Sequence, residues 1–463
     1  MTAARRAVVL GGGLAGVLAA AALARHVPEV VVVERDRYPE GPEPRTGVPQ
    51  ARHTHVLMDG GARAMERVLP GVTGQLVAAG AHRHGMPDGV VMLSPQGWLE
   101  RFPGRRYAYS CSRALLDWTV RQQAFKNGRI TVTERSEAVG LLGGPGAVTG
   151  VRLRDRDTGG EHELEAGFVV DATGRGSHAP RWLAALGLPE VEEEVVDSGQ
   201  AYATRVFRAP AGAEQGFPMV NVLAAPGTGR PGCGAALLPI EEGRWMVTLG
   251  GTRGGEPPTD EEGYARFVRH AVRHPLVADL IEAAEPLGPI RGSRSSANRR
   301  RRFDRLPSWP AGLVVTGDAA TTFNPVYGHG MSVAARCAVV LDEVLRRYGP
   351  VPDAAVRAQR GIGRAAQDAW VIATTQDVLY PDAVGPRPGG ALRLQRRFVD
   401  RSVRVATRNP AVSAALIDSF TLARPFTTLA RPSALVHTAL GPRGEPLAAP
   451  PLTAWERRFL PGR

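Results

Sequence analysis

The sequence predicts an α/β fold with a parallel sheet, a second part rich in β-strands, and helices toward the C-terminus. Three observations lead to this prediction. Apolar runs at 7–10, 168–171 and 312–315 each end in a turn of small residues, which is typical of buried parallel strands. Between 200 and 249 apolar and polar residues alternate, as in strands that cover one face of a core. Residues 385–440 have a helical pattern, and a tail interrupted by prolines follows.

The composition fits a folded globular protein. Hydrophobic residues make up 43% of the 463 residues, and 55 glycines and 38 prolines are too few for a fibrous or low-complexity chain. The formal net charge is +12, but Lys126 is the single lysine, so the basic residues are nearly all arginines. This bias is typical of a GC-rich genome, and we expect no nucleic-acid partner. The surplus lies in 385–463, where thirteen arginines stand against four acidic residues.

The cysteines and the beginning of the chain point to a reducing compartment. Cys111, Cys233 and Cys337 are far apart and form no C-x-x-C pair, so neither a disulfide framework nor a metal site is expected. The first residues pass directly into the strand at 7–10 without an apolar signal region, and no later run is long enough to span a membrane. We therefore expect a cytoplasmic protein without a transmembrane segment.

The strand at 7–10 opens a nucleotide-binding pattern. It leads into G-x-G-x-x-G at Gly11, Gly13 and Gly16, then into a helix and a second strand that ends at Glu34. The first glycine of such a motif makes the tight turn, the second lets the backbone approach a pyrophosphate, and the third allows helix and strand to pack closely. The acidic residue can bind a ribose hydroxyl. A glycine motif alone is weak, but this full order predicts a dinucleotide site.

Two later segments indicate which dinucleotide binds. The strand at 168–171 continues into Ala-Thr-Gly, and the strand at 312–315 continues into Thr-Gly-Asp, with Asp318 ahead of a long helix at 331–348. A Gly-Asp pair alone would indicate a turn with a capping aspartate. In this order, both segments resemble signatures of FAD-dependent monooxygenases. The resemblance implies that Asp318 binds the ribityl chain and that the segment from Pro325 approaches the isoalloxazine ring.

The resemblance also implies the fold and the remaining FAD contacts. The fold would be a Rossmann-type FAD-binding domain like that of p-hydroxybenzoate hydroxylase, with a β-rich substrate domain and C-terminal helices. In this family an arginine and close backbone lie under the flavin after the second strand, and an S-R-x-x-L helix start brings a second arginine to FAD. The residues predicted to bind FAD are Gly11, Gly13, Leu14, Ala15, Gly16, Glu34, Arg35, Arg45, Gly47, Val48, Arg113, Val139, Asp318, Pro325, Gly328, Gly330 and Met331.

The late glycine segment favours a particular branch. Its pattern P-x-x-G-x-G-M-[ST]-V-A at 325–334 resembles squalene epoxidase, and it departs from phenol hydroxylases at Thr321, Asn324 and Ser332. Together with 41–55, 111–120 and 250–258, it looks like the polyene epoxidases of polyether ionophore biosynthesis, such as those of the lasalocid and monensin pathways. A tryptophan halogenase would need a tunnel lysine and a W-x-W-x-I-P segment, which this sequence lacks.

This resemblance implies a reaction and its reactants. Alkenes of a linear polyene polyketide would be epoxidised through a C4a-hydroperoxyflavin formed with O₂, with electrons from NAD(P)H directly or through a flavin reductase. The alkene attacks the flavin-bound oxygen without losing a proton, so we predict no catalytic side chain. The basic C-terminal segment is a solvated helix face, or it docks an acyl carrier protein or a membrane surface. Alternatives are a prenyl-chain reductase, a hydroxylase of another apolar substrate, and a non-catalytic flavin-binding protein.

The alternating strands provide the expected floor of the substrate tunnel. We predict Phe207, Trp245, Met246 and Tyr327 as lining residues, although the first three fit a plain sheet core equally well. The expected domains are a discontinuous FAD-binding domain, a β-sheet substrate domain inserted in it, and a C-terminal helical segment with its tail. Their bounds are 1–82, 105–180 and 290–384 for the first, 83–104 and 181–289 for the second, and 385–463 for the third.

Overall fold

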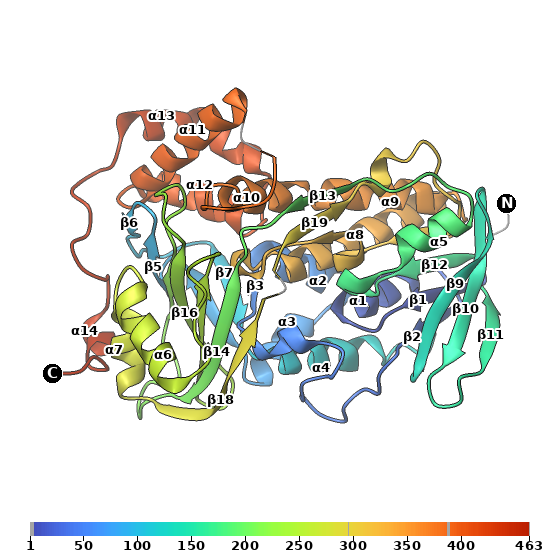
Figure 1. The fold of residues 1–463 in the computed structure, drawn as a ribbon, viewed down its shortest axis with the longest axis horizontal. Coiled ribbons are helices and arrows are strands. Elements are labelled where there is room, and N and C mark those ends of the chain that lie inside the picture. The colour runs from blue at the N-terminus through green and yellow to red at the C-terminus, as the bar shows by residue number, and fades with distance from the viewer. Residues whose placement is uncertain (1–3, 295, 387–388, 463) are drawn as a thin grey trace.

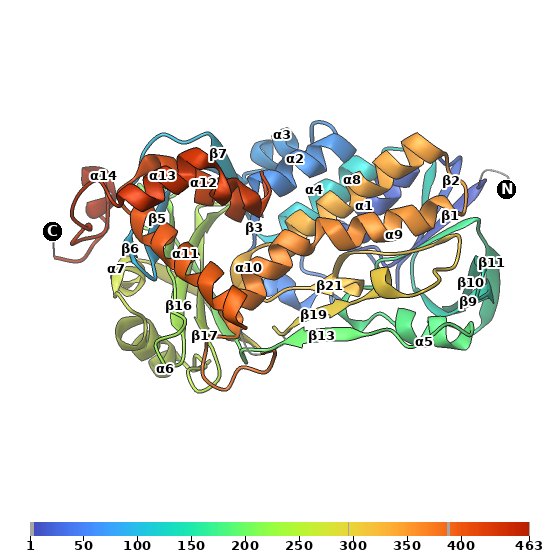
Figure 2. The same cartoon turned by 90° about the horizontal axis from the view of Figure 1, so that it is seen from above.

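The fold is known from a computed structural model, which describes residues 4–294, 296–386 and 389–462. It is elongated, with a parallel sheet near the N-terminus and a larger, mostly antiparallel sheet at the other end (Figure 1). The C-terminal helices lie over the end with the larger sheet (Figures 1 and 2). The predicted α/β class with C-terminal helices is confirmed.

The N-terminal sheet has five parallel strands in the order β20-β12-β1-β2-β8. Apart from the edge strand β8, these strands are almost continuously buried, which explains the apolar runs of the sequence. A three-stranded antiparallel sheet, β9 to β11, contacts this sheet, while α1 packs against it and against α8. The bounds are β1 Arg6–Leu10, β2 Glu29–Val33, β8 Ile130–Thr133, β9 Ser136–Gly144, β10 Ala147–Asp155, β11 Glu161–Glu165, β12 Phe168–Asp171, β20 Leu313–Val315, α1 Leu14–Leu23 and α8 Gly330–Tyr348.

The larger sheet has seven strands in the order β18-β14-β17-β16-β15-β5-β6. Strands β5 and β6 come from within 83–104, and the other five from within 181–293, so segments far apart in sequence complete one sheet. The domain boundaries given above remain our proposal. The bounds are β5 Val90–Ser94, β6 Gly97–Trp98, β14 Ala201–Arg208, β15 Met219–Val222, β16 Cys233–Ile240, β17 Arg244–Gly251 and β18 Glu285–Ser293, with α6 Glu261–Arg266 and α7 Leu276–Glu282 packed on its outer face.

Two small sheets and several helices lie between and around these parts. One small sheet has the order β3-β7-β4 and the other β13-β19-β21. Their bounds are β3 Val56–Met58, β4 His82–Met86, β7 Arg106–Ser110, β13 Glu193–Val196, β19 Asn298–Arg301 and β21 Thr321–Thr322. The remaining helices before the C-terminal segment are α2 Asp59–Val68, α3 Val72–Ala78, α4 Arg113–Ala124, α5 Ala179–Ala185, α9 Ala354–Ala365 and α10 Gln367–Asp377.

The C-terminal segment is held to the rest by ion pairs and by aromatic packing. It contains α11 Gly390–Ala406, α12 Pro410–Phe420, α13 Pro432–Leu440 and α14 Ala454–Arg457. Asp418 on α12 accepts a hydrogen bond from Arg106 Nε at 2.6 Å, and Arg106 also pairs with the buried Asp59 at 3.1 Å. Phe459 packs edge-on against Phe217, with 5.8 Å between ring centroids. No helix in the described ranges has both the length and the hydropathy to span a bilayer.

Candidate active site

The glycine turn between β1 and α1 is closely packed on one side and open on the other. Gly11 has φ of +89°, and a Cβ there would lie 2.7 Å from the carbonyl oxygen of Ala172. A Cβ at Gly16 would lie only 1.8 Å from the Gly11 carbonyl oxygen, so both positions exclude side chains. At Gly13, by contrast, no described atom lies within 4 Å of the Cβ position. The turn therefore leaves open backbone where α1 begins with Leu14 and Ala15.

Glu34 and Arg45 form a buried ion pair beside this turn. Glu34 Oε2 accepts hydrogen bonds from the Gly12 amide at 2.8 Å and from Arg45 Nη2 at 2.5 Å. Arg45 Nη1 also donates to the Gly12 carbonyl oxygen at 2.8 Å, and the guanidinium lies over the Tyr38 ring. The structure thus places Arg45 at the glycine turn. Its Nε is buried without a hydrogen-bond partner among the described residues, so one donor remains for a ligand.

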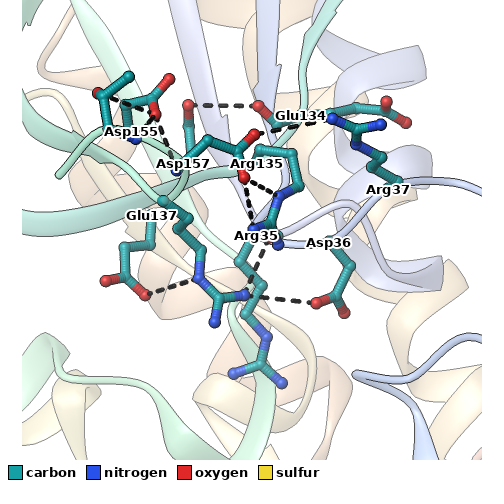
Figure 3. A network of polar contacts seen from close by, with 11 residues as sticks. Arg35, Asp36, Arg37, Glu134, Arg135, Glu137, Asp155 and Asp157 are labelled. Carbon is teal, nitrogen blue, oxygen red and sulfur yellow. Dashed lines mark hydrogen bonds and ion pairs between the residues drawn. The ribbon is translucent and has the colours of Figure 1, made fainter. Parts of the chain in front are cut away.

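The edge of the sheet beyond Glu34 is densely charged, and its charges pair with one another (Figure 3). Arg135 donates to Asp157 at 2.7 Å, and Arg156 lies 3.6 Å from Asp36. Arg35 is exposed, and its Nη2 would lie 3.2 Å from a Cβ at Gly47, so its side chain reaches toward the loop at 45–48. Two other predicted residues lie in this part of the fold, Val48 before a short 3-10 helix and Val139 on β9.

Asp318 lies in a 3-10 turn after β20, and its carboxylate lies at the start of α8. A Cβ at Gly330 would be 4.0 Å from Asp318 Oδ1. Burial raises the pKa of Asp318, and the positive charges of Arg175 and Arg113 only partly offset this rise. Within the described ranges no donor forms a hydrogen bond with this carboxylate. Of the other predicted contacts, Arg113 begins α4 and pairs with Asp117, and Met331 is buried in the first turn of α8.

A buried polar network supports the loop at 325–328 from behind. Asp377, at the end of α10, accepts hydrogen bonds from Tyr327 OH at 2.7 Å, Asn324 Nδ2 at 2.9 Å and Asn298 Nδ2 at 2.7 Å. Asn324 Oδ1 in turn accepts from Tyr202 OH at 2.5 Å, which ties the loop to the seven-stranded sheet. Burial raises the pKa of Asp377, although the donated bonds oppose this. In front of the network, Pro325 and Val326 are exposed.

In the sequence, Asn324 stands out only as a departure from phenol hydroxylases, and nothing indicates Asp377 or Asn298. Asp377 belongs to no recognisable motif. It is the last residue of an ordinary helix, 50 residues after Tyr327 in the loop that it supports. The polar Asn324, three residues before Tyr327, is the one signal in the sequence that this loop needs a buried partner. No local pattern identifies that partner.

The face of the seven-stranded sheet turned toward these residues is polar near the loop at 50–55. His53 Nδ1 lies 2.8 Å from Thr204 Oγ1, which lies 2.6 Å from Thr248 Oγ1. Burial, and secondarily the charge of Arg52, lowers the pKa of His53. For His55, burial and the nearby Arg113 lower the pKa to about 3. Both imidazoles are therefore neutral near pH 7.

Two of the four predicted lining residues do not lie on this face. Side chains alternate along a strand, and Phe207 and Trp245 are directly opposite each other on the outer face, in the core with Phe217. We correct the prediction for these two residues. Met246 alternates with Trp245 and pairs with Leu238, which belongs to an inner apolar cluster. Tyr327 lies in the loop and is bonded to Asp377.

The comparisons with known proteins agree with this geometry. A model of the FAD-binding domain matches residues 5–346. The chain belongs to the FAD-binding domain family of FAD-dependent monooxygenases. This FAD-binding protein is 30% identical over 439 residues to Protein Rv3254 of Mycobacterium tuberculosis, across 90% of this chain and 89% of that protein. It is 30% identical over 360 residues to kynurenine 3-monooxygenase of Salinispora tropica, across 74% and 73% of the two chains.

Solved structures share the fold. The flavin-dependent brominase Bmp2 superposes with a TM-score of 0.64 and 14% identity, over 91% of this chain and 94% of the brominase. The side chains and backbone of the site, considered apart from the comparisons, also fit FAD. It has open backbone at Gly13, an unpartnered donor at Arg45 Nε, and an Asp318 carboxylate without a donor from the described residues. These are the features that a pyrophosphate and a polyhydroxyl chain require.

Proposed function

We propose that this chain is a FAD-dependent monooxygenase that epoxidises alkenes of a linear polyene polyketide, using O₂ and NAD(P)H, in polyether biosynthesis. One observation carries the proposal beyond the family. An apolar cluster begins at the loop at 325–328, where a Cβ at Gly328 would lie 3.3 Å from the terminal methyl group of Met58. From there it continues through Met86 and Met219 to Leu238, with Met92 packed against it.

A methionine-rich cluster suits a long flexible hydrocarbon. Methionine is unbranched and polarizable, so it adapts its shape to different parts of an apolar chain. A polyene presents one trisubstituted alkene after another, and each must take a similar position while the rest of the chain lies elsewhere. His53, which bonds Thr204 on the same face of the sheet, is neutral because burial lowers its pKa. This chemistry supports a substrate without ionised groups near the reacting bond.

We assign the FAD contacts from the same geometry. Glu34 would bind the ribose, Gly13 and the start of α1 the pyrophosphate, and Asp318 the ribityl chain. The loop from Pro325 to Gly328 would support the ring. When bound and reduced, FAD would activate O₂, which is the source of the transferred oxygen atom. The chain itself orients the alkene, excludes water and holds the loop through Asp377, and we assign it no catalytic acid or base.

The reaction is tested with purified holoenzyme, NAD(P)H, O₂ and a linear polyene bearing trisubstituted alkenes. We expect products heavier by one oxygen atom per reacted alkene, with the oxygen derived from labelled O₂. If NAD(P)H reduces the bound flavin only when a flavin reductase is added, the electrons come through a partner. Peroxide without oxygenated product would contradict the proposal, and anaerobic consumption of the substrate would indicate a reductase instead.

The cofactor assignment has a separate test. Asp318→Ala removes the carboxylate that lies at the start of α8, and we expect the purified variant to be largely free of flavin. Asp304→Ala, which removes a carboxylate paired with Arg302 near β19, should keep its flavin. A yellow Asp318→Ala protein with normal flavin content would overturn the assignment.

A further inference from the structure

The exposed side of α11 is a row of arginines. Apart from Gly390, the described residues of α11 that are exposed are four arginines and one leucine. They are Arg393, Leu394, Arg397, Arg401 and Arg404. The arginines recur at intervals of four, four and three residues, which places them on one face of the helix. Leu394 has 70% of its surface exposed.

The four arginines of this row stand together without a neutralising ion pair among the described residues. By contrast, the exposed arginines of β10 are paired, Arg152 with Glu163 at 3.1 Å and Arg154 with Glu161 at 2.9 Å. The positive potential of α11 is therefore available to an external anion.

An exposed apolar row on α13 lies beside the arginine row. On α13, residues Leu435, Val436, Ala439 and Leu440 are exposed, at helical spacing on one face. Val436 and Leu440 expose 55% and 76% of their surfaces. Arg401 donates hydrogen bonds to the carbonyl oxygens of Thr438 and Ala439, so the end of α13 lies against the middle of the arginine row. Both helices lie in the outer layer of the molecule (Figures 1 and 2).

We propose that α11 and α13 form a docking surface for a bilayer that contains anionic phospholipid. Leucines and valine on a helix enter the boundary between headgroups and acyl chains, while guanidinium groups bind lipid phosphates. A depression of about 250 Å³ beside α11 supports this assignment, since Arg397, Arg401 and Arg404 line it and would surround a phosphate, with Asp400 at one side. Protruding apolar side chains suit a deformable lipid surface better than an acidic protein, which would have to supply a matching groove.

Binding to lipid vesicles tests the docking surface without using the enzyme reaction. The holoenzyme is sedimented with phosphatidylcholine vesicles and with vesicles in which about a third of the lipid is phosphatidylglycerol. We expect at least about tenfold stronger binding to the anionic vesicles, weakened by added salt. Equal binding to both vesicles, or binding to neither, would overturn the proposal.

Matched variants separate this surface from net charge. The double variant Arg393→Gln/Arg397→Gln should lose most of the binding, whereas Arg152→Gln/Arg154→Gln, with the same loss of charge on β10, should bind like the unmodified chain. Val436→Ser/Leu440→Ser changes only exposed side chains and should also weaken binding. If the β10 variant lost as much binding as the α11 variant, the surface would have no special role. Capture by soluble polyglutamate but not by anionic vesicles would replace the lipid with an acidic protein.

Discussion

The two faces of the seven-stranded sheet differ in their interactions, which are aromatic packing on one face and side-chain hydrogen bonds on the other. On the outer face Phe207 and Trp245 lie in an aromatic core with Phe217, whose ring centroid is 4.7 Å from that of Trp245. On the inner face Thr204 and Thr248 form hydrogen bonds with each other, and Thr204 with His53. Alternate residues of the same strands thus stabilise the fold on the outer face and position the loop of the candidate site on the inner face. The predictions below test this division.

The largest effect is expected on the outer face. Trp245→Ala removes a fully buried indole, and the resulting cavity should lower the free energy of unfolding by about 3–5 kcal/mol. Urea unfolding followed by circular dichroism measures this change. The variant should keep its KM for the substrate under conditions where it is folded. A loss below about 1 kcal/mol would place Trp245 outside the core and break the comparison.

The next effect concerns the polar network behind the inner face. Asp377→Asn replaces a carboxylate that accepts hydrogen bonds from Asn298, Asn324 and Tyr327, so an amide NH₂ would have to face these donors. We expect a loss of about 2–3 kcal/mol in unfolding free energy. We also expect a changed flavin reduction potential, because the loop at 325–328 loses its support.

The matched control for Asp377 lies on the same helix. Asp368→Asn makes the same substitution in the first turn of α10, where no ion pair is found in the described part of the chain. It should leave both stability and potential unchanged. A stable Asp377→Asn variant with an unchanged potential would show that the network does not position the loop.

Acid should destabilise the fold at His329, because protonation would place a charge on a buried imidazole. His329 is buried, its Nε2 bonds the Phe420 carbonyl oxygen at 2.9 Å, and burial lowers its pKa to about 4. The folded state therefore binds fewer protons than the unfolded state between this value and about 6.5, the unperturbed pKa of histidine. The contribution of His329 to the free energy of unfolding is fully present above about pH 6.5. It falls by about 1.4 kcal/mol for each pH unit between that value and about pH 4.

A substitution isolates this pH dependence. His329→Gln keeps a donor for Phe420 but does not titrate, so its stability should vary less with pH between about 4 and 6.5. His162→Gln, on the exposed side of β11, should retain the slope of the unmodified chain. Identical slopes in all three proteins would assign the acid sensitivity to other groups, such as His55.

The sequence predicted the nucleotide-binding part well because its constraints are local. Gly11 and Gly16 meet backbone atoms at distances that no side chain allows, and such limits leave a fixed spacing in the sequence. The inner face of the sheet could not be predicted in this way. Along β14 and β17, the residues that point to either face of the sheet include large side chains. The contacts that mark one face as the inner one come from His53 and Asn324, which are far away in the chain. For Phe207 and Trp245 the sequence therefore fits the tunnel lining and the sheet core equally well, and the structure places them in the core.

The smallest effect is expected on the inner face itself. Thr204→Val keeps the shape of the side chain but removes its hydrogen bonds to His53 and Thr248, so the free energy of unfolding should fall by only about 1 kcal/mol. Because His53 then loses its partner, the loop at 50–55 should be less ordered, and the KM for an apolar substrate should rise while flavin content stays constant. Thr228→Val, in an exposed loop, is the control. An unchanged KM, or a stability loss as large as that of Trp245→Ala, would mean that the two faces do not divide stability from binding.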